Sequence, residues 1–219
     1  MQTYKQRVYA KDIPTTAHTM DLELEPLPRF HGAHVSTILK YIGLKTKIMK
    51  EFAPVQEDQA LPVADDGFKM NWMMMAGLAW ESYLFRRVPG IIWQPGEVVL
   101  DGIGMNCDGL NLGGFWDMPG SQERGITCDW LEECKVTWQS VGNPDLPGWY
   151  RISQIMSYCH GFGLTRARLW MYHVRGDYKQ DFGPQVWCHW IEFTKEELFA
   201  NWRMVRLGKE EMERESCPV

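Results

Sequence analysis

The stretch that most constrains the fold is residues 129–138, which read DWLEECKVTW. It is apolar enough to form a buried strand, and side chains alternate between the two faces of a strand. Glu133 and Lys135 therefore share one face, whereas Cys134 lies on the other. Burying a carboxylate and an ammonium is costly unless the two groups pair or bind something. The stretch therefore predicts a central strand with a polar site on one face.

A second polar position comes before this strand in the chain. The segment EVVLDGIGMNCDGL is typical of a strand that leads into Asp108, with Gly109 turning the chain just after it. If Asp108 lies beside Glu133, two carboxylates meet next to Lys135, an arrangement that suits a hard divalent cation and a polarised water. Two less specific explanations stay open, because Asp-Gly is a turn signal by itself and most Glu-x-Lys pairs on strands are surface ion pairs.

Composition limits the classes of protein that fit. A chain of 219 residues, 45% of them hydrophobic, forms one domain with a real core or one domain with appendages. We expect a core over about residues 70–178, an arm and a helix in residues 1–69, and a strand and a helix in residues 179–219. The net charge of −5 excludes a globally basic nucleic-acid-binding protein, so any DNA contact needs a local basic patch.

The cysteines and the apolar runs argue against several other classes. None of the six cysteines forms a Cys-x-x-Cys pair, which favours reduced, mostly buried thiols over a zinc or iron–sulfur site. The N-terminal segment lacks the apolar centre of a signal peptide, and no apolar run is long enough to cross a bilayer. We therefore expect a cytoplasmic protein without membrane contact.

Two helices are predicted ahead of these strands. Residues 34–44, HVSTILKYIGL, predict a short helix that is capped by Ser36. Residues 70–88 predict a longer helix whose apolar stripe contains Glu81, a carboxylate on the face that packs inward. Gly77, one turn earlier, would let a backbone or a ligand approach closely.

The rest of the chain alternates between strands and helices. Gln154 and Tyr158 lie one turn apart on a later helix, and Thr194 and Glu197 form a capping box that opens the last helix. We expect the tail of that helix, from residue 210, to be frayed. The core order of helix, three strands, helix and strand predicts an α/β fold with a mixed sheet flanked by helices. The expected strands are residues 97–105, 109–113, 129–138, 167–178 and 185–193, and the later helices are residues 147–160, stopped by Gly161 and Gly163, and the segment after Thr194.

The order of the elements and the residues on them resemble the PD-(D/E)XK nuclease superfamily, in its RecB-type and phage lambda-exonuclease-like branch. That branch carries a Gly-x-x-x-(His/Glu) helix, an Asp-Gly turn, a Glu-x-Lys strand and a Gln-x-x-x-Tyr helix. The resemblance covers about residues 70–178 and implies a restriction-endonuclease-like αβββαβ core. The Pro-Asp pair of the family name is absent, because Cys107 precedes the aspartate. The matching residues are Gly77, Glu81, Asp108, Gly109, Glu133, Lys135, Gln154 and Tyr158.

The resemblance implies roles in metal binding and catalysis. Asp108 and Glu133 would bind Mg²⁺ or Mn²⁺ with help from the backbone carbonyl of Cys134, and Glu81 would complete or orient the metal shell. Lys135 would position the attacking water and stabilise the charge that builds on phosphorus. Phosphodiester hydrolysis needs an activated water and charge neutralisation, which carboxylates, a hard metal ion and a nearby cation supply.

The resemblance also implies contacts with DNA. Gln154 and Tyr158 would hold the DNA strand, or would keep Lys135 and the metal ligands in place. Basic residues are the best candidates for phosphate contacts, although they also fit ordinary solvated faces. The predicted DNA-binding residues are Ser36, Arg86, Arg87, Arg166 and Arg168.

The function expected from the resemblance is that of a Mg²⁺-dependent exonuclease of phage or prophage type, which acts on linear double-stranded DNA ends in recombination. Relatives of this kind work beside a single-strand annealing protein and form rings around DNA, so a homo-oligomer in the cytoplasm of a bacterial host is expected. Two alternatives stay open. One is a structure-specific endonuclease or nickase of the same fold, and the other is a non-catalytic DNA- or protein-binding module.

Overall fold

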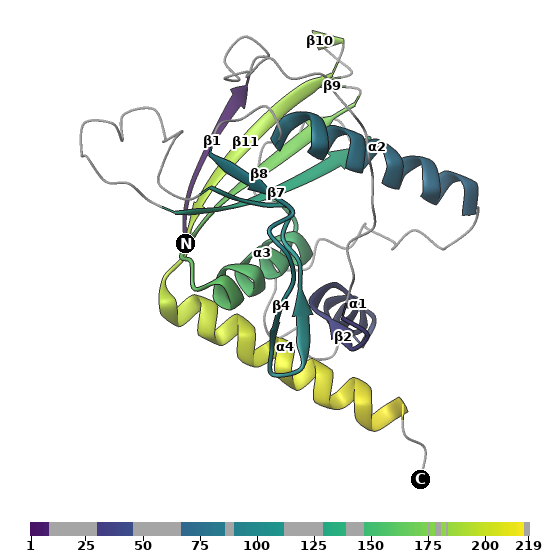
Figure 1. Cartoon of the computed structure of the whole chain (residues 1–219), viewed down its shortest axis with the longest axis vertical. Coiled ribbons are helices and arrows are strands. Elements are labelled where there is room, and N and C mark those ends of the chain that lie inside the picture. Colours follow the sequence, from purple (N-terminus) through teal and green to yellow (C-terminus); the bar gives the residue numbers. More distant parts are fainter. Residues whose placement is uncertain are drawn as a thin grey trace.

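The centre of the molecule is a six-stranded mixed sheet (Figure 1). Its strands are β1 (Gln2–Val8), β3 (Ile91–Trp93), β6 (Gly109–Asn111), β7 (Trp130–Thr137), β8 (Arg166–His173) and β11 (Gln185–Glu192). They lie in the order β1-β11-β8-β7-β6-β3, with β7 and β8 parallel and the other neighbours antiparallel. This computed structural model describes residues 1–8, 30–45, 67–85, 90–111, 129–138, 147–174, 176–177, 181–182 and 184–216.

Helices cover both faces of the sheet, which confirms the predicted α/β fold. They are α1 (Val35–Lys45), α2 (Gly67–Phe85), α3 (Trp149–Phe162) and α4 (Lys195–Ser216). α1, α3 and α4 pack on one another, whereas α2 contacts β7 and β3. Alternation along β7 supplies two separate cores, because Leu131 belongs to the cluster shared with α1, α3 and α4, and Trp130 belongs to the cluster shared with α2.

The segment expected as one strand over residues 97–105 is a hairpin. β4 (Val98–Leu100) and β5 (Ile103–Met105) pair antiparallel, and β5 also pairs in parallel with β2 (Ala33–His34). The chain turns at Asp101 and Gly102, whose φ values are +52° and +67°. Asp-Gly is a hairpin signal, and here it lies inside an apolar run that otherwise reads as continuous.

Two other element boundaries can be compared with the sequence: the start of α4 and the end of the strand expected over residues 167–178. The capping box before α4 is confirmed, since the Glu197 N–H donates to Thr194 Oγ1 at 3.1 Å and the Thr194 N–H donates to Glu197 Oε2 at 2.9 Å. The strand expected over residues 167–178 ends earlier, at His173, and is followed by a two-stranded sheet of β9 (Gly176–Asp177) and β10 (Asp181–Phe182).

Three local expectations are wrong. α1 begins at Val35, so Ser36 lies inside the helix and does not cap it. α3 runs through Gly161, although it ends at Gly163 as expected, where a φ of 71° suits a left-handed C-cap. α4 continues to Ser216, so the tail is helical well beyond residue 210. A Cβ added at Gly77 would meet nothing within 4 Å, which leaves the expected approach of a backbone or a ligand untested.

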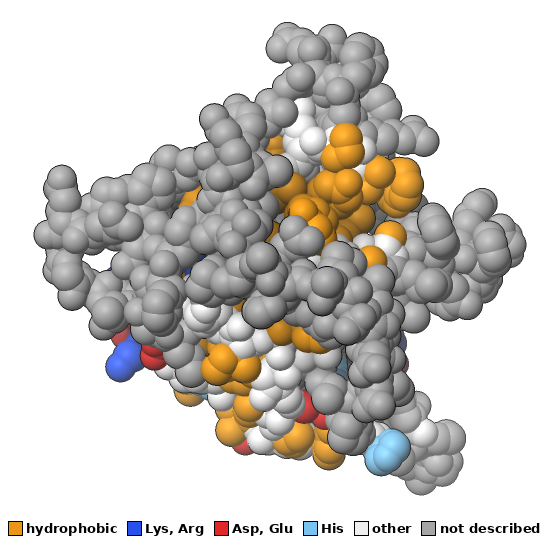
Figure 2. Space-filling model, turned by 45° about the horizontal axis from the view of Figure 1, so that its top comes forward, with side chains coloured by type: hydrophobic (Ala, Val, Ile, Leu, Met, Phe, Trp, Pro, Cys, Tyr) orange, Lys and Arg blue, Asp and Glu red, His pale blue; other side chains and the backbone are white. Residues whose placement is uncertain are grey.

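Two further observations concern the described surface and the described helices. On the face drawn in Figure 2, the described side chains are mostly apolar or neutral, with only scattered Lys and Arg atoms. None of the described helices has both the length and the apolar character that a membrane span needs.

Behind the polar face of β7 lies a fully buried ion pair. Glu132 and Arg168 are opposite each other in the parallel β7–β8 register, and both side chains are 0% exposed. Arg168 donates to Glu132 Oε1 from Nε at 2.7 Å and also from Nη2, and the Trp170 indole N–H donates to Glu132 Oε2 at 2.8 Å. The expectation that Arg168 contacts DNA is therefore wrong, because its guanidinium is enclosed and held by a carboxylate.

This pair generates a prediction about stability. Arg168→Met leaves the Glu132 carboxylate buried without its cation, and we expect it to lower the free energy of unfolding by about 3–5 kcal/mol. The matched control is Arg166→Met, which removes a partly exposed ion pair with Glu192 and should cost less than about 1 kcal/mol. Urea unfolding measures both. Equal losses in the two variants would contradict the assignment.

Candidate metal and phosphodiester site

The candidate site begins where β6 and β7 stop pairing. Gly109 faces Glu132 in the antiparallel register, and beyond that pair the carboxylate of Asp108 replaces the backbone of β6. Asp108 Oδ2 accepts the N–H of Cys134 at 2.7 Å. Gly109 fits closely between β3 and β7, because a Cβ there would lie 3.0 Å from Ile91 Cγ2 and 3.3 Å from Glu132 Cβ.

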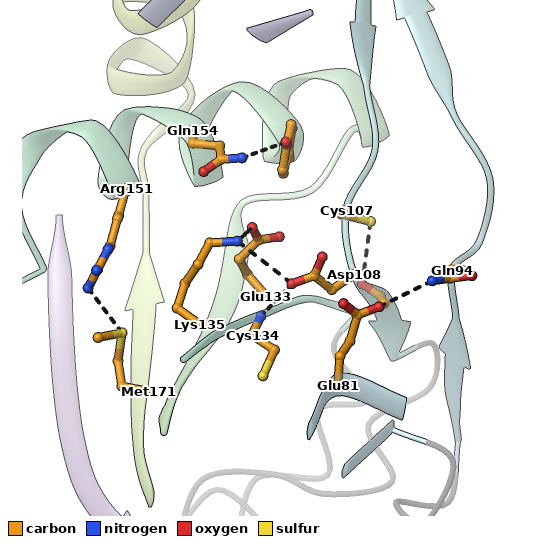
Figure 3. A network of polar contacts seen from close by, with 12 residues as sticks. Glu81, Gln94, Cys107, Asp108, Glu133, Cys134, Lys135, Arg151, Gln154 and Met171 are labelled. Atoms are coloured by element: carbon orange, nitrogen blue, oxygen red, sulfur yellow. Dashed lines mark hydrogen bonds and ion pairs between the residues drawn. The ribbon is translucent and has the colours of Figure 1, made fainter. Parts of the chain in front are cut away.

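Glu133 and Lys135 meet Asp108 at this point, as the sequence predicted (Figure 3). The Lys135 ammonium donates to Glu133 Oε1 and lies 3.9 Å from Asp108 Oδ2. The Glu133 side chain is 1% exposed, while those of Asp108 and Lys135 are 20% and 28% exposed. Glu133 Oε2 is buried and has no hydrogen-bond partner among the described residues. The site therefore contains a buried carboxylate oxygen beside two groups that a ligand can reach.

Glu81 enters from α2 and completes the set of carboxylates. It is 8% exposed, and its Oε1 accepts the Trp93 indole N–H at 2.8 Å and the Gln94 side-chain amide at 3.5 Å. Gln94 also donates its backbone N–H to the Asp108 carbonyl at 3.0 Å, with an unusual φ of +47°. The sequence analysis missed Trp93 and Gln94, because β3 is only three residues long and carries no motif.

Burial and mutual repulsion raise the pKa values of these carboxyl groups. The pKa of Glu81 is raised to about 7 and that of Glu133 to about 8, first by burial and then by the charge of Asp108. Burial also raises the pKa of Asp108, although Lys135 and the Cys134 N–H oppose the rise. Glu81 and Glu133 hold protons near neutral pH because the cluster contains more carboxyl groups than the Lys135 ammonium alone can balance.

The pKa of Lys135 is also raised, but for a different reason. Burial alone would lower the pKa of this ammonium, but the charges of Glu133 and Asp108 outweigh burial and raise it. Lys135 is therefore a permanent cation at neutral pH and not a proton acceptor. Its chemistry is that of a fixed positive charge beside whatever ligand the carboxylates hold.

Gln154 and Tyr158 from α3 lie over the same face of the sheet. Both are buried, and the Gln154 side-chain amide donates to the Tyr158 hydroxyl at 2.7 Å. Burial raises the pKa of Tyr158, and the charge of Glu133 raises it further, so the hydroxyl lies within electrostatic reach of the carboxylates. The structure thus brings together Glu81, Asp108, Glu133, Lys135, Gln154 and Tyr158.

The predicted DNA-contact residues are not gathered in the same way. Arg166 pairs with Glu192 at 3.1 Å and lies over Trp130, on the α2 side of the sheet. The backbone carbonyl of Ser36 accepts the Tyr150 hydroxyl at 3.2 Å. Arg86 and Arg87 lie outside the described residues.

The donor set fits a hard divalent cation in its chemistry. Carboxylate oxygens are the ligands that Mg²⁺ prefers, and Glu133 offers a buried oxygen that nothing else in the described structure satisfies. In the described part of the chain, however, no three His, Cys, Asp or Glu side chains already stand close enough to hold an ion. Lys135 occupies one oxygen of Glu133, so metal binding requires the carboxylates to move together. The described cysteines Cys107, Cys134, Cys159 and Cys188 are buried free thiols.

Comparisons with known proteins gave weak likenesses only. The sequence matches no family model and none of the curated proteins. An alkaline exonuclease, LHK-Exo from Laribacter hongkongensis, superposes with a TM-score of 0.48 at 16% identity, over 85% of this chain and 90% of that chain. LHK-Exo in complex with dAMP gives 0.47 and 18%, over 84% and 89%. The crystal structure of SSO0001 gives 0.42 and 14%, over 89% and 82%. Function is therefore argued from the site itself.

The raised pKa values generate a prediction about pH. In the metal-free protein, Glu81 and Glu133 hold protons that the unfolded chain, with a carboxyl pKa of 4.5, has already released. The folded state binds more protons in this range, so the free energy of unfolding falls as pH rises from about 5 to about 8. Calorimetry in EDTA should show a falling Tm.

Glu133→Gln should reduce this fall, because the amide stays neutral at every pH. The matched control is Glu192→Gln, which changes an exposed carboxylate and should leave the pH dependence as in the wild type. A Tm that rises over this range, or a fall that Glu133→Gln leaves unchanged, would contradict the electrostatics assigned to the site.

Proposed function

We propose that this chain is a metal-dependent DNA nuclease that hydrolyses phosphodiester bonds. The observation that carries the proposal is the convergence of Asp108 and Glu133 on the ammonium of Lys135, with Glu133 Oε2 buried and unsatisfied in the described structure. Excess buried negative charge next to a permanent cation suits a divalent ion and a phosphate together.

Four groups would hold the ion. Asp108, Glu133 and Glu81 would supply carboxylate oxygens, and the backbone carbonyl of Cys134 would be the fourth ligand. The N–H and C=O of one strand residue point to the same side of the strand. Because the Cys134 N–H donates to Asp108, its carbonyl is also directed toward Asp108. A bound Mg²⁺ or Mn²⁺ supplies Lewis-acid polarisation of the phosphate and a more acidic water. That the chain binds Mg²⁺ or Mn²⁺ at these residues is itself part of the proposal.

The side chains divide the remaining work. Lys135 stays protonated, so it stabilises negative charge that develops on the phosphate oxygens during attack. Trp93 and Gln94 fix the orientation of Glu81 through their hydrogen bonds to its carboxylate. Gln154 orders the Tyr158 hydroxyl over the same face, where it limits the space available to the strand being cut.

The substrate we propose is the end of a linear DNA duplex. A chain with a net charge of −5 does not attract DNA over its whole surface, and the described side chains on the face in Figure 2 include only scattered basic atoms. Binding then depends on cations next to the site, an arrangement that favours feeding in a free end over gripping a long duplex. We favour a phage-type exonuclease that acts in DNA recombination. The proposal further includes a ring-shaped oligomer and a single-strand annealing partner.

One observation favours a second candidate function. Lys135 already donates to Glu133, and no described set of three ligands is closed around an ion position. A module that binds DNA or a protein without cutting would keep this arrangement permanently. Calorimetric titration with Mg²⁺ and Mn²⁺ separates the two functions, because only the nuclease requires the ion.

The proposal makes a prediction for two variants. Asp108→Asn removes a metal-binding carboxylate and should abolish cleavage, whereas Lys135→Met should lower kcat on the order of a hundredfold, as expected for the loss of one preorganised charge. Both should still bind DNA. Lys209→Met, which removes an ammonium on α4 paired with Glu213, is the matched control and should cleave normally. Cleavage by Asp108→Asn at the wild-type rate would refute the assigned site.

A second prediction concerns DNA ends. In Mg²⁺ buffer, linear duplex should be shortened progressively to small products, while covalently closed circles survive. Increasing salt should slow the reaction steeply, because phosphate contacts release counterions. A time course with both substrates measures this. Equal cutting of both would favour the endonuclease form, and no cutting with either metal ion would favour the binding module.

A further inference from the structure

Arg151, in the first turn of α3, carries a charge that the described structure does not balance. Its guanidinium is partly buried, and among the described residues it donates from Nη1 to the Met171 sulfur at 3.5 Å. A thioether is a weak acceptor, whereas an arginine offers five N–H donors. No carboxylate among the described residues lies within ion-pair distance of it.

Three other cations on β7 and β8, among the side chains that the structure describes, each have a carboxylate partner. Arg168 is held by Glu132, Arg166 by Glu192, and Lys135 by Glu133 and Asp108. Burial lowers the pKa of Arg151, and no other cause acts on it. A partly buried arginine without an anion is costly, and the described residues supply none, so the guanidinium is open to an anion that binds at this site.

The position of Arg151 relates it to the candidate site. Met171, which it touches, is the β8 partner of Lys135 in the parallel register. In Figure 3 the labelled side chains run from Glu81 through Asp108 and Lys135 to Arg151, which descends from α3 beyond Lys135. The guanidinium therefore lies on the same face of the sheet as the ammonium, on the side away from Asp108.

We propose that Arg151 binds a backbone phosphate of the DNA strand next to the phosphate that is cut. The inference rests on the nuclease function proposed above and names a further contact of the same site. Guanidinium groups bind phosphate oxygens through paired N–H donors. Gln154, one turn further along α3, places this contact on the same helix as the groups that lie over the scissile position.

The test compares binding across a salt series. Wild-type protein, R151M and R151K are titrated in EDTA against a fluorescein-labelled duplex whose 5′ ends carry hydroxyl groups, so that any phosphate contact is internal to the strand. R166M is the matched control, because Arg166 is also a partly buried arginine but is paired with Glu192. Fluorescence anisotropy gives the affinity at each salt concentration.

One lost phosphate contact should reduce the slope of log K against log salt by about 0.9. We expect this reduction for R151M, a wild-type slope with weaker binding for R151K, and no change for R166M. If R151M lowers stability too far to fold, R151Q gives the same neutral test. A purely structural arginine would lower the urea midpoint and leave the slope unchanged.

Two failures can be told apart. If wild type and R166M bind the duplex and the neutral Arg151 variants bind with the same affinity and slope, the Arg151 contact is overturned while the nuclease proposal survives. If the wild type does not bind duplex DNA at low salt in EDTA and also cuts none in Mg²⁺ or Mn²⁺, both the contact and the proposed function are overturned.

Discussion

The hydrogen bond from the Cys134 N–H to the Asp108 carboxylate, 2.7 Å long, is the interaction on which the site depends. β6 pairs with β7 only as far as Glu132, and at the next step a side chain takes the place of a strand. This exchange brings a carboxylate into a position where backbone would otherwise lie. Asp108 and Glu133 therefore lie close together, and the positive charge of Lys135 reduces the repulsion between their carboxylates.

The buried carboxylates on the two faces of β7 are stabilised in different ways. Toward α2, Glu132 has both oxygens satisfied by Arg168 and Trp170, so the network is closed and nothing can be added to it. Toward α3, Glu133 keeps one oxygen unsatisfied in the described structure and its cation partly exposed. Neighbouring glutamates in the sequence thus have different surroundings: Glu132 is enclosed in an ion pair between strands, whereas Glu133 keeps one oxygen without a partner in the described structure.

Short-range patterns in the sequence predicted the elements that carry the site. Alternation placed Glu133 and Lys135 on one face, and helical spacing placed Gln154 one turn from Tyr158. Arg168 was misjudged because its burial depends on the β7–β8 register, which sets it opposite Glu132 and which no local signal reveals. Gln94 was missed for a related reason, since its φ of +47° and its contact with Glu81 arise only when β3 meets α2.

The β4–β5 hairpin and the start of α1 were also misjudged because local sequence patterns do not reveal tertiary partners. Asp101 and Gly102 carried a turn signal, but the apolar residues on both sides made the run look continuous. Ser36 has the chemistry of a cap, yet the parallel pairing of β2 with β5 leads the chain directly into α1 at Val35. In each case the tertiary partner decided between two locally acceptable structures.

The pairing of β1 with β11 has a consequence for how the chain is made. Gln2 lies opposite Glu192, so the first strand emerges from the ribosome long before its partner exists. Contacts between such distant segments form late, because loop-closure entropy must be overcome first. The unit of β6, β7, α3 and β8 is complete once His173 has been synthesised, whereas β11 follows afterwards. The strands that carry Glu133 and Lys135 and that flank Asp108 are therefore synthesised before β11, and β1 can pair with β11 only after Glu192 has been synthesised.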